Sequence, residues 1–232
     1  MAYNYRPQVY YHAIDSIPQW LEVTTEQLDK IYTSGLIDAC DLHINCHYNY
    51  DNWQQLKDKY NHPNIVWHKS TAQPAEFEHP TYILMQQHAL RHPERNYPVL
   101  YVHQKGITHT DIKATYWRWY MDYFNIERWQ DCVTLLATGE YDTCGVQRAA
   151  RSDNLPTFYE GNQCWYTSDF LRKATPLKLP SEVGYVAQYD IPHSMYRSDV
   201  ELWAWYNNDR WYCFHHSGLN LYCSEYPPEN YR

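Results

Sequence analysis

Residues 99–103 read VLYVH, a continuous apolar run that is followed directly by Gln104, Lys105 and Gly106. Such a run is typical of a parallel strand that is buried on both of its faces. With the segments upstream of it, this run gives the order strand, helix, strand, strand, helix, strand, in which residues 99–103 are the last strand. We therefore predict an α/β fold, a single Rossmann-type domain with a mainly parallel central sheet and with residues 99–103 as its central, buried strand.

The other expected elements lie on both sides of this strand. Gly35 ends a helix that begins at Thr24 or Thr25. A longer helix is expected to break near Asn125, and residues 176–195, which contain three prolines, are expected to form a mobile lid. Further strands are expected over residues 9–14, 41–46, 64–67, 141–146 and 211–215, helices over 54–60, 80–92, 112–137 and 200–206, a turn entering a helix over 161–174, and a loop over 148–158.

The length and charge of the chain exclude several classes of protein. Its 232 residues suit one domain, and 44% hydrophobic with 20% charged residues argue against disorder and coiled coil. The net charge is 19 − 27 = −8, which disfavours a general nucleic-acid binder but permits a local basic pocket for one small anion. No apolar run approaches the ~20 residues of a membrane helix or resembles a signal peptide, so we expect a cytoplasmic protein.

The aromatic residues are unusual in kind. The chain has 25 Tyr and 10 Trp but only 5 Phe, so that most of its aromatic rings carry a polar tip. Such side chains suit half-wet clefts in which sugar or nucleobase faces stack. A core that is built from Tyr in place of Phe is the alternative. The seven Cys form no CxxC pair, and we expect them to be reduced thiols.

The end of the central strand is the first candidate site, because parallel α/β sheets bind ligands beyond the carboxyl ends of their strands. There His103 supplies a titratable donor, Lys105 a fixed positive charge, and Gly106 a backbone that a ligand can approach closely. These residue types predict a diphosphate site, and a simple surface turn is the alternative. No metal-ligand spacing, GxGxxG fingerprint, P-loop or GxSxG elbow is present.

Eight short motifs follow one another along almost the whole chain, from about residue 8 to about residue 222. They are VYYHA at 9–13, SGL at 34–36, HQKG at 103–106, Trp117-Arg118 with Met121, Asp142 with Gly145, GNQCW at 161–165, ELW at 201–203 and HHS at 215–217.

In their order and spacing, these motifs resemble those of a family of small bacterial and viral glycosyltransferase-like proteins with a GT-A-type nucleotide-sugar fold. The resemblance implies one GT-A-like domain over residues 1–232. It implies a nucleoside diphosphate-sugar half over about 1–110 and an acceptor half over about 111–232. The expected partners are a nucleoside diphosphate-sugar donor and a glycan acceptor, without a membrane span and without nucleic acid.

Under this resemblance we predict that Lys105 stabilises the leaving diphosphate and that Glu201 is the base that takes the acceptor's proton. Asp169 and Asp199 are rivals of Glu201, and Glu201 would otherwise only complement a helix dipole. The predicted donor and diphosphate residues are Tyr11, His12, His103, Lys105, Gly106, Arg118 and His216, and the predicted acceptor residues are Asn162, Trp165 and Asp142.

Three of these residues have structural alternatives. Arg118 would be either a phosphate ligand or a buried partner of Asp122 or Asp142. Trp165 would be a core aromatic residue, and His216 a buried histidine with its hydrogen bonds satisfied.

The chain departs from the family pattern in three places. Gln104 stands where the family has Thr, and Gln163 and Cys164 stand where it has Phe and Trp, so the acceptor wall is expected to be smaller and more polar. Many GT-A enzymes hold a divalent metal, Mn or Mg, through Asp-x-Asp at the end of the fourth strand. Here that place holds His-Gln-Lys-Gly, so the sequence supports no metal site, and we assign no other cofactor.

Two other classes of function remain open at this point. A non-catalytic carbohydrate-binding module, or an inactive transferase relic, also fits the aromatic content and the missing Asp-x-Asp. A glycosyltransferase that acts on a modified DNA base is disfavoured by the charge of −8. A sugar-only binder has no need of a cation at the end of a strand, so Lys105 favours the enzyme.

Overall fold

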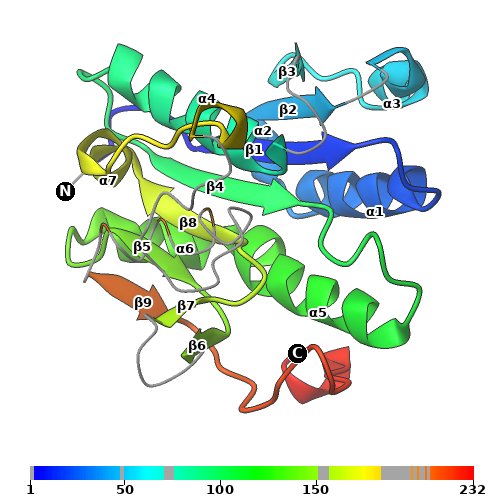
Figure 1. Cartoon of the computed structure of the whole chain (residues 1–232). Coiled ribbons are helices and arrows are strands. Elements are labelled where there is room, and N and C mark those ends of the chain that lie inside the picture. The colour runs from blue at the N-terminus through cyan, green and yellow to red at the C-terminus, as the bar shows by residue number, and fades with distance from the viewer. Residues whose placement is uncertain are drawn as a thin grey trace.

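The computed structural model of the chain describes residues 3–47, 50–70, 76–150, 157–183 and 210–232, together with Val200, Trp203 and Asn207. Seven strands form one sheet in the order β3-β2-β1-β4-β8-β5-β9 (Figure 1). The four strands β1–β4 run parallel, β8 is antiparallel to both of its neighbours, and β5 and β9 are parallel. The predicted α/β domain with a mainly parallel sheet is therefore confirmed.

The strands of this sheet are β1 (Gln8–Ile14), β2 (Asp41–His47), β3 (Ile65–Lys69), β4 (Pro98–His103), β5 (Thr143–Gly145), β8 (Cys164–Thr167) and β9 (Trp211–Cys213). A separate two-stranded sheet consists of β6 (Arg148–Ala150) and β7 (Thr157–Tyr159).

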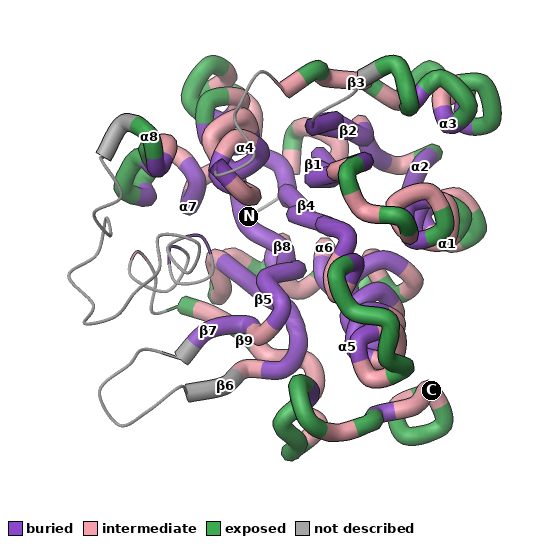
Figure 2. The backbone as a smooth tube through the Cα atoms, turned by 45° about the vertical axis from the view of Figure 1, so that its right-hand side comes forward, coloured by how far each residue is buried: buried purple, intermediate pink, exposed green. Residues whose placement is uncertain are grey.

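Helices cover both faces of the sheet. The helices α4 and α7 lie on one face and α1, α2 and α6 on the other, so that the strands are buried between two helical layers (Figure 2). The C-terminal segment ends beside α5 (Figure 1). The helices are α1 (Trp20–Thr33), α2 (Leu36–Ala39), α3 (Gln54–Lys59), α4 (His79–Arg91), α5 (Ile112–Asp122), α6 (Trp129–Ala137), α7 (Ser168–Lys173) and α8 (Pro180–Val183), with shorter helical turns over Tyr50–Trp53, Tyr123–Glu127 and Pro228–Asn230.

The strand that decides the fold is central, as predicted. The strand β4 lies between β1 and β8, and all of its residues are buried. Leu100 and Val102 belong to the core on the α1 side, whereas Val99 and Tyr101 belong to the core on the α4 side. Because both faces are packed, the strand has no polar position before its end, which explains why the sequence reads as one apolar run.

Three elements differ from the predictions. Residues 164–167, which were expected in a turn entering a helix, form the strand β8, because this buried segment pairs with β4 on one side and with β5 on the other. The helix α1 begins at Trp20 rather than at Thr24, because the Thr24 hydroxyl donates to the carbonyl oxygen of Trp20 at 2.6 Å from inside the helix. The expected loop over residues 148–158 contains β6 and the start of β7, which are three residues long and too short to show a side-chain period. The break near Asn125 is a five-residue π-helical turn between α5 and α6, as expected.

Several predictions fall outside the described residues. These are most of the predicted lid, over residues 184–195, and also Asp199 and Glu201. Within the described ranges, no helix has the length and apolar character needed to cross a membrane.

One buried carboxylate ties several elements together. Asp122, the last residue of α5, has no exposed surface. Its carboxylate accepts hydrogen bonds from Lys30 of α1 at 2.9 Å and from the side-chain amides of Gln27 and Gln163 at 3.1 Å each. A buried charge is tolerated only when it is paired and hydrogen-bonded, and Asp122 meets both conditions.

The charges around Asp122 continue into a small network. Glu26 pairs with Lys30 at 2.8 Å and with Arg118 of α5 at 3.1 Å. Burial disfavours the charge on Lys30, but the carboxylates of Asp122 and Glu26 outweigh burial and raise the pKa of Lys30. The network therefore fixes α1 against α5 on the same side of the sheet.

We predict that Asp122→Ala destabilises the protein by about 3–5 kcal/mol, because Lys30 loses its buried partner. Urea unfolding measures this change. The matched control is Lys59→Ala, which breaks the exposed ion pair with Asp29 and should cost less than about 1 kcal/mol. Equal losses in the two variants would contradict the importance of the buried network.

The α4 side of the sheet also buries histidines. The His43 ring stacks on Tyr10 with centroids 4.6 Å apart, and its nitrogens lie 3.0 Å from His68 Nε2 and 3.0 Å from Gln8 Oε1. The Tyr10 hydroxyl in turn contacts His88 Nδ1. Burial, with the neighbouring rings of His68 and His88, lowers the pKa of His43 to about 3. Burial first, and then nearby positive groups, lowers the pKa of His88 to about 4.

These histidines predict acid sensitivity. Below a pH of about 6.5 the unfolded chain takes up protons that the folded chain does not, so the free energy of unfolding falls as the pH drops from about 7 towards about 4. Each such histidine contributes a slope of up to about 1.4 kcal/mol per pH unit. Urea unfolding at several pH values should show this slope, with a smaller slope in His43→Gln. His109→Gln, at an exposed site, should leave it unchanged. A flat profile over this range would contradict the prediction.

Candidate functional site

The parallel strands β1–β4 end at one edge of the sheet, on the right in Figure 1. From β1 the chain continues outward to β2 and β3, and then returns to β4 on the other side of β1. The strand order therefore reverses between β1 and β4. Open α/β sheets bind ligands in the crevice at such a point, beyond the carboxyl ends of the strands.

A row of polar residues crosses the sheet near this edge. His12 of β1 lies opposite Asn45 of β2 and opposite His103 of β4, and Asn45 lies opposite His68 of β3. His12, Asn45 and His103 are buried although their side chains are polar. We call His68, Asn45, His12 and His103 the polar row. It contains no lysine or arginine.

The first turn of α4 covers the polar row. The Thr81 hydroxyl oxygen lies 2.9 Å from His12 Nδ1 and 2.9 Å from Asn45 Nδ2, and the His47 ring lies 4.4 Å from the His12 ring. Burial, with the rings of His47 and His103, lowers the pKa of His12 well below its usual range. Burial lowers the pKa of His47 to about 4. Both imidazoles are therefore neutral at pH 7.

The turn before β8 brings Asn162 to the same edge, because Cys164 lies opposite Tyr101, two residues before the end of β4. Asn162 is buried and has a left-handed φ of 61°. Its Oδ1 accepts a hydrogen bond from the hydroxyl of Tyr82 on α4 at 2.8 Å, while its Nδ2 is buried without a hydrogen-bond partner. Asn162 thus joins α4 to the end of the polar row.

The loop after β4 carries the predicted cation. Lys105 Nζ lies 3.9 Å from the centroid of the Trp117 ring and 5.4 Å from that of Tyr222. Gly106 has a φ of 76°, and a Cβ at this position would lie only 2.8 Å from the Cβ of Ala114. Glycine is therefore required here by both backbone conformation and space.

Gln104 fixes the start of this loop. Its Oε1 accepts a hydrogen bond from the backbone N–H of Ile14 at 2.7 Å, and its Nε2 donates to the Thr24 hydroxyl at 2.7 Å. The amide thus reaches both the end of β1 and the first half of α1. Gln104 therefore has a structural role at the point where β1 and β4 meet.

The helix α5 brings distant motifs together. Met121 faces Gly161, where a Cβ would lie 2.5 Å from the Met121 sulfur. The Tyr120 hydroxyl donates to the carbonyl oxygen of His215 at 2.9 Å. Trp117, Tyr120 and Met121 are spaced i, i+3 and i+4, so one face of this helix contacts three motifs that lie far apart in the sequence.

Arg118 takes a structural partner, although not one of those that were expected. Its guanidinium donates to the carbonyl oxygen of Lys105 at 3.1 Å and to Glu26 at 3.1 Å, rather than pairing with Asp122 or Asp142. The side chain is only 5% exposed. Arg118 therefore holds the loop after β4 in place.

Three other predicted residues do not reach the polar row. Tyr11 points to the opposite face of the sheet, where its hydroxyl donates to Gln27 at 2.8 Å. Trp165 is a core residue whose indole donates to the carbonyl oxygen of Asn125 at 2.9 Å. His216 is exposed in the C-terminal segment.

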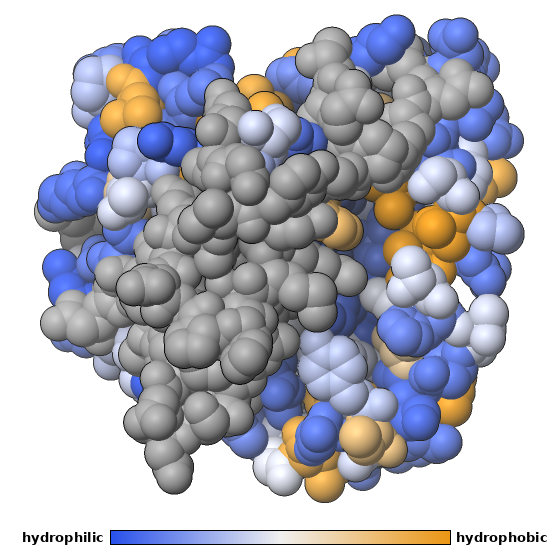
Figure 3. All heavy atoms as spheres, viewed as in Figure 1, coloured by the Kyte–Doolittle hydropathy of each residue, from blue (hydrophilic) through white to orange (hydrophobic). Residues whose placement is uncertain are grey.

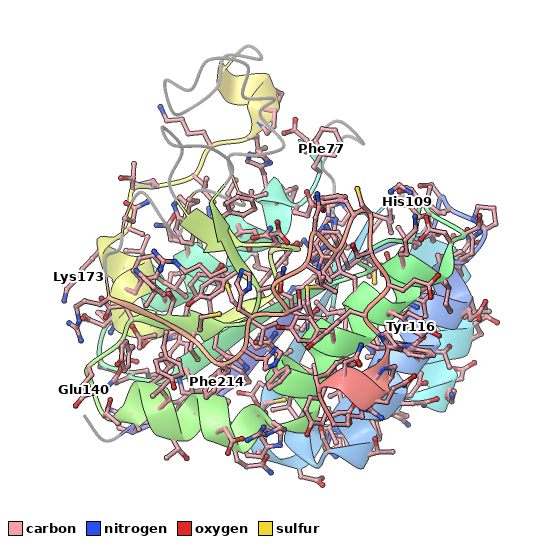
Figure 4. The ribbon with its side chains drawn as sticks, turned by 90° about the horizontal axis from the view of Figure 1, so that it is seen from below. Phe77, His109, Tyr116, Glu140, Lys173 and Phe214 are labelled. Atoms are coloured by element: carbon pink, nitrogen blue, oxygen red, sulfur yellow. The ribbon has the colours of Figure 1, made fainter. Side chains whose placement is uncertain are left out.

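Asp142 lies at the opposite edge of the sheet. It precedes β5, which runs in the same direction as β4, and its carboxylate lies 3.8 Å from Arg210. Figure 4 shows this separation, with Glu140 and Lys173 at one end of the molecule and His109, from the loop after β4, at the other. Asp142 is therefore remote from Lys105 and from the polar row.

The sequence reasoning missed Asn45, His47 and Thr81. A signal was present in β2, where polar residues occupy positions 41, 43, 45 and 47 and alternate with Leu42, Ile44 and Cys46. Alternate polar positions on a strand that parallel neighbours bury point to a polar surface on one face. The contact of Thr81 with two of these strands arises only when α4 packs on the sheet.

The described part of the site has no arrangement for a metal ion, since none of its groups of His, Cys, Asp or Glu reaches three members in a suitable geometry. Most of the described surface on the face shown in Figure 3 is hydrophilic. The candidate site therefore combines neutral hydrogen-bonding groups along the polar row with one cation, Lys105, in the adjoining loop.

Comparisons with known proteins concern the fold. No protein-family model and no curated protein sequence matches the chain. One similar solved structure is the 4-diphosphocytidyl-2C-methyl-D-erythritol synthase from Anaerococcus prevotii DSM 20548. It aligns with a TM-score of 0.50 and 11% sequence identity over 90% of this chain and 86% of that chain. At this identity the likeness supports the α/β architecture with its mainly parallel sheet.

Proposed function

We propose that the protein is a glycosyltransferase that moves a sugar from a nucleoside diphosphate-sugar to a hydroxyl group of a glycan or similar acceptor. We place its site beyond the carboxyl ends of β1 and β4, where the strand order reverses. The fold that the chain shares with a synthase of a diphosphocytidyl compound supports a nucleotide-derived donor.

The observation that carries this proposal is the meeting of separate motifs at one sheet edge. Lys105 lies on Trp117, Gly161 lies against Met121, and Asn162 is bound by Tyr82. These motifs are the ones on which the resemblance to GT-A-type proteins rests. A cation beside this edge of the sheet is a group that would stabilise a leaving diphosphate.

The proposed reaction has a simple balance of charge. The acceptor oxygen forms a bond to the anomeric carbon of the sugar, and the bond from that carbon to the diphosphate oxygen breaks. The electron pair of the broken bond stays on the diphosphate, whose negative charge Lys105 stabilises. The proton of the acceptor hydroxyl goes to a carboxylate, for which Glu201 is our choice.

We predict that a nucleoside diphosphate raises the Tm of the protein and that Lys105→Ala weakens its binding roughly 10- to 100-fold, the loss expected for one charged contact. Transfer should slow as well, because the charge acts in both the ground state and the transition state. Titration calorimetry and a hydrolysis screen over nucleotide sugars, with and without EDTA, measure both effects.

Lys173→Ala is the matched control for Lys105→Ala. It removes the same charge from the opposite edge of the sheet, where Lys173 pairs with Asp169, and it should leave binding unchanged. If uridine, guanosine and thymidine diphosphates all fail to shift the Tm, the carbohydrate-binding module becomes the better account.

We predict that Glu201→Gln slows transfer by roughly 10²- to 10⁴-fold and leaves donor binding nearly intact, because the base touches only the acceptor. Steady-state rates and donor affinity, measured on the same preparation, separate the two effects. Full activity in this variant would move the role to Asp199. The other rival, Asp169, lies in α7 at the opposite edge and pairs with Lys173.

A further inference from the structure

The hydrogen bonds around His12 form a directed relay. The amide of Asn45 donates to the Thr81 hydroxyl oxygen at 2.9 Å and also lies 3.4 Å from His47 Nε2. The same Thr81 oxygen lies 2.9 Å from His12 Nδ1. Both N–H groups of the Asn45 amide thus have acceptors, and this fixes the direction of the first step.

The direction of the relay determines the tautomer of His12. The Thr81 hydroxyl already accepts from Asn45, and its own hydrogen has one acceptor among the described residues, the Nδ1 of His12. A hydroxyl hydrogen rotates to the acceptor that is available. Nδ1 of His12 therefore carries the lone pair, and the ring's proton is on Nε2.

The Nε2–H group of His12 has no hydrogen bond to a described residue, although His12 is only 7% exposed. It sits at the reversal of the strand order, where a ligand is expected, with Asn45 and His103 on either side in the polar row. A protonated His12 would have the rings of His47 and His103 close by, and burial opposes its charge.

We propose that His12, locked as its Nε2–H tautomer by the Asn45–Thr81 relay, is a specificity residue that donates a hydrogen bond to an uncharged oxygen of the ligand. This inference rests on the proposed function and divides its site into two parts. Lys105 receives the diphosphate, and the polar row receives an uncharged carbonyl or hydroxyl oxygen, from either the nucleoside or the sugar. Thr81 and Asn45 are positioning residues.

The chemistry of the row favours an uncharged group. A phosphate placed on the polar row would lose its water without gaining a cation, and burial of an unpaired charge is costly. A hydroxyl or carbonyl oxygen loses far less on desolvation and gains one neutral hydrogen bond. We therefore expect the polar row to bind uncharged groups in preference to charged ones.

The relay is tested first without any ligand, by NMR of the protein labelled with ¹⁵N-histidine. Protonated and unprotonated imidazole nitrogens resonate far apart, and loss of a signal pair in His12→Gln assigns His12. We expect protonation at Nε2 in the wild type and in Thr81→Ser, and a shift towards Nδ1 protonation in Thr81→Val, which lacks the hydroxyl. Protonation at Nδ1 in the wild type would overturn the relay.

The specificity is tested by calorimetry with uridine, glucose and inorganic diphosphate as separate probes. Thr81→Val and His12→Phe should weaken the binding of uridine, of glucose or of both by roughly threefold to tenfold. Thr81→Ser and His12→Gln, which keep the hydroxyl and a side-chain N–H, should bind within about twofold of the wild type. Inorganic diphosphate should bind all of these variants equally.

The outcomes separate this inference from the proposed function. A loss that is confined to uridine assigns the row to the nucleoside, and a loss that is confined to glucose assigns it to the sugar. Equal losses for diphosphate, or no binding of either neutral probe to the wild type, would overturn the inference. If the NMR result holds but no nucleotide sugar is turned over, the relay stands and the proposed reaction falls.

Discussion

The charge of Asp122 must be neutralised inside the protein, and much of the arrangement of the site follows from how this is done. Lys30 neutralises it from α1, and Gln27 and Gln163 complete its hydrogen bonds. Lys30 and Gln27 belong to α1, and Gln163 belongs to the turn before β8. The carboxylate of Asp122 therefore joins both of these segments to α5. With α5 held in this way, its other side chains can serve as fixed supports.

Side chains from α5 and α4 give the carboxyl-terminal edge of the sheet a charged part and an uncharged part. Arg118 holds the backbone of Lys105, and Trp117 lies beneath its ammonium group, so this cation of the site is positioned by a helix. On the α4 side, Thr81 binds the neutral groups His12 and Asn45. A ligand in which a charged diphosphate adjoins an uncharged group matches this division, and the proposed nucleotide sugar has its diphosphate between two such groups.

The sequence predicted the local features of the fold better than the contacts of the site. The apolar run of β4, the break near Asn125 and the position of Lys105 depend on neighbours in the chain, and the structure has them where they were expected. The polar row depends on the register of four strands, which no local pattern reveals. Arg118 shows the same limit, since its partner Glu26 lies 92 residues away.

A crystal structure of the protein with the nucleoside diphosphate that raises its Tm most would test the central claim most directly. The account predicts that the diphosphate lies within hydrogen-bond distance of Lys105 Nζ, at the ends of β1 and β4. It also predicts an uncharged oxygen of the nucleoside, or of a bound sugar, opposite His12 Nε2. A diphosphate bound at the other edge of the sheet, near Asp142 and Arg210, or seated on the polar row itself, would contradict the account.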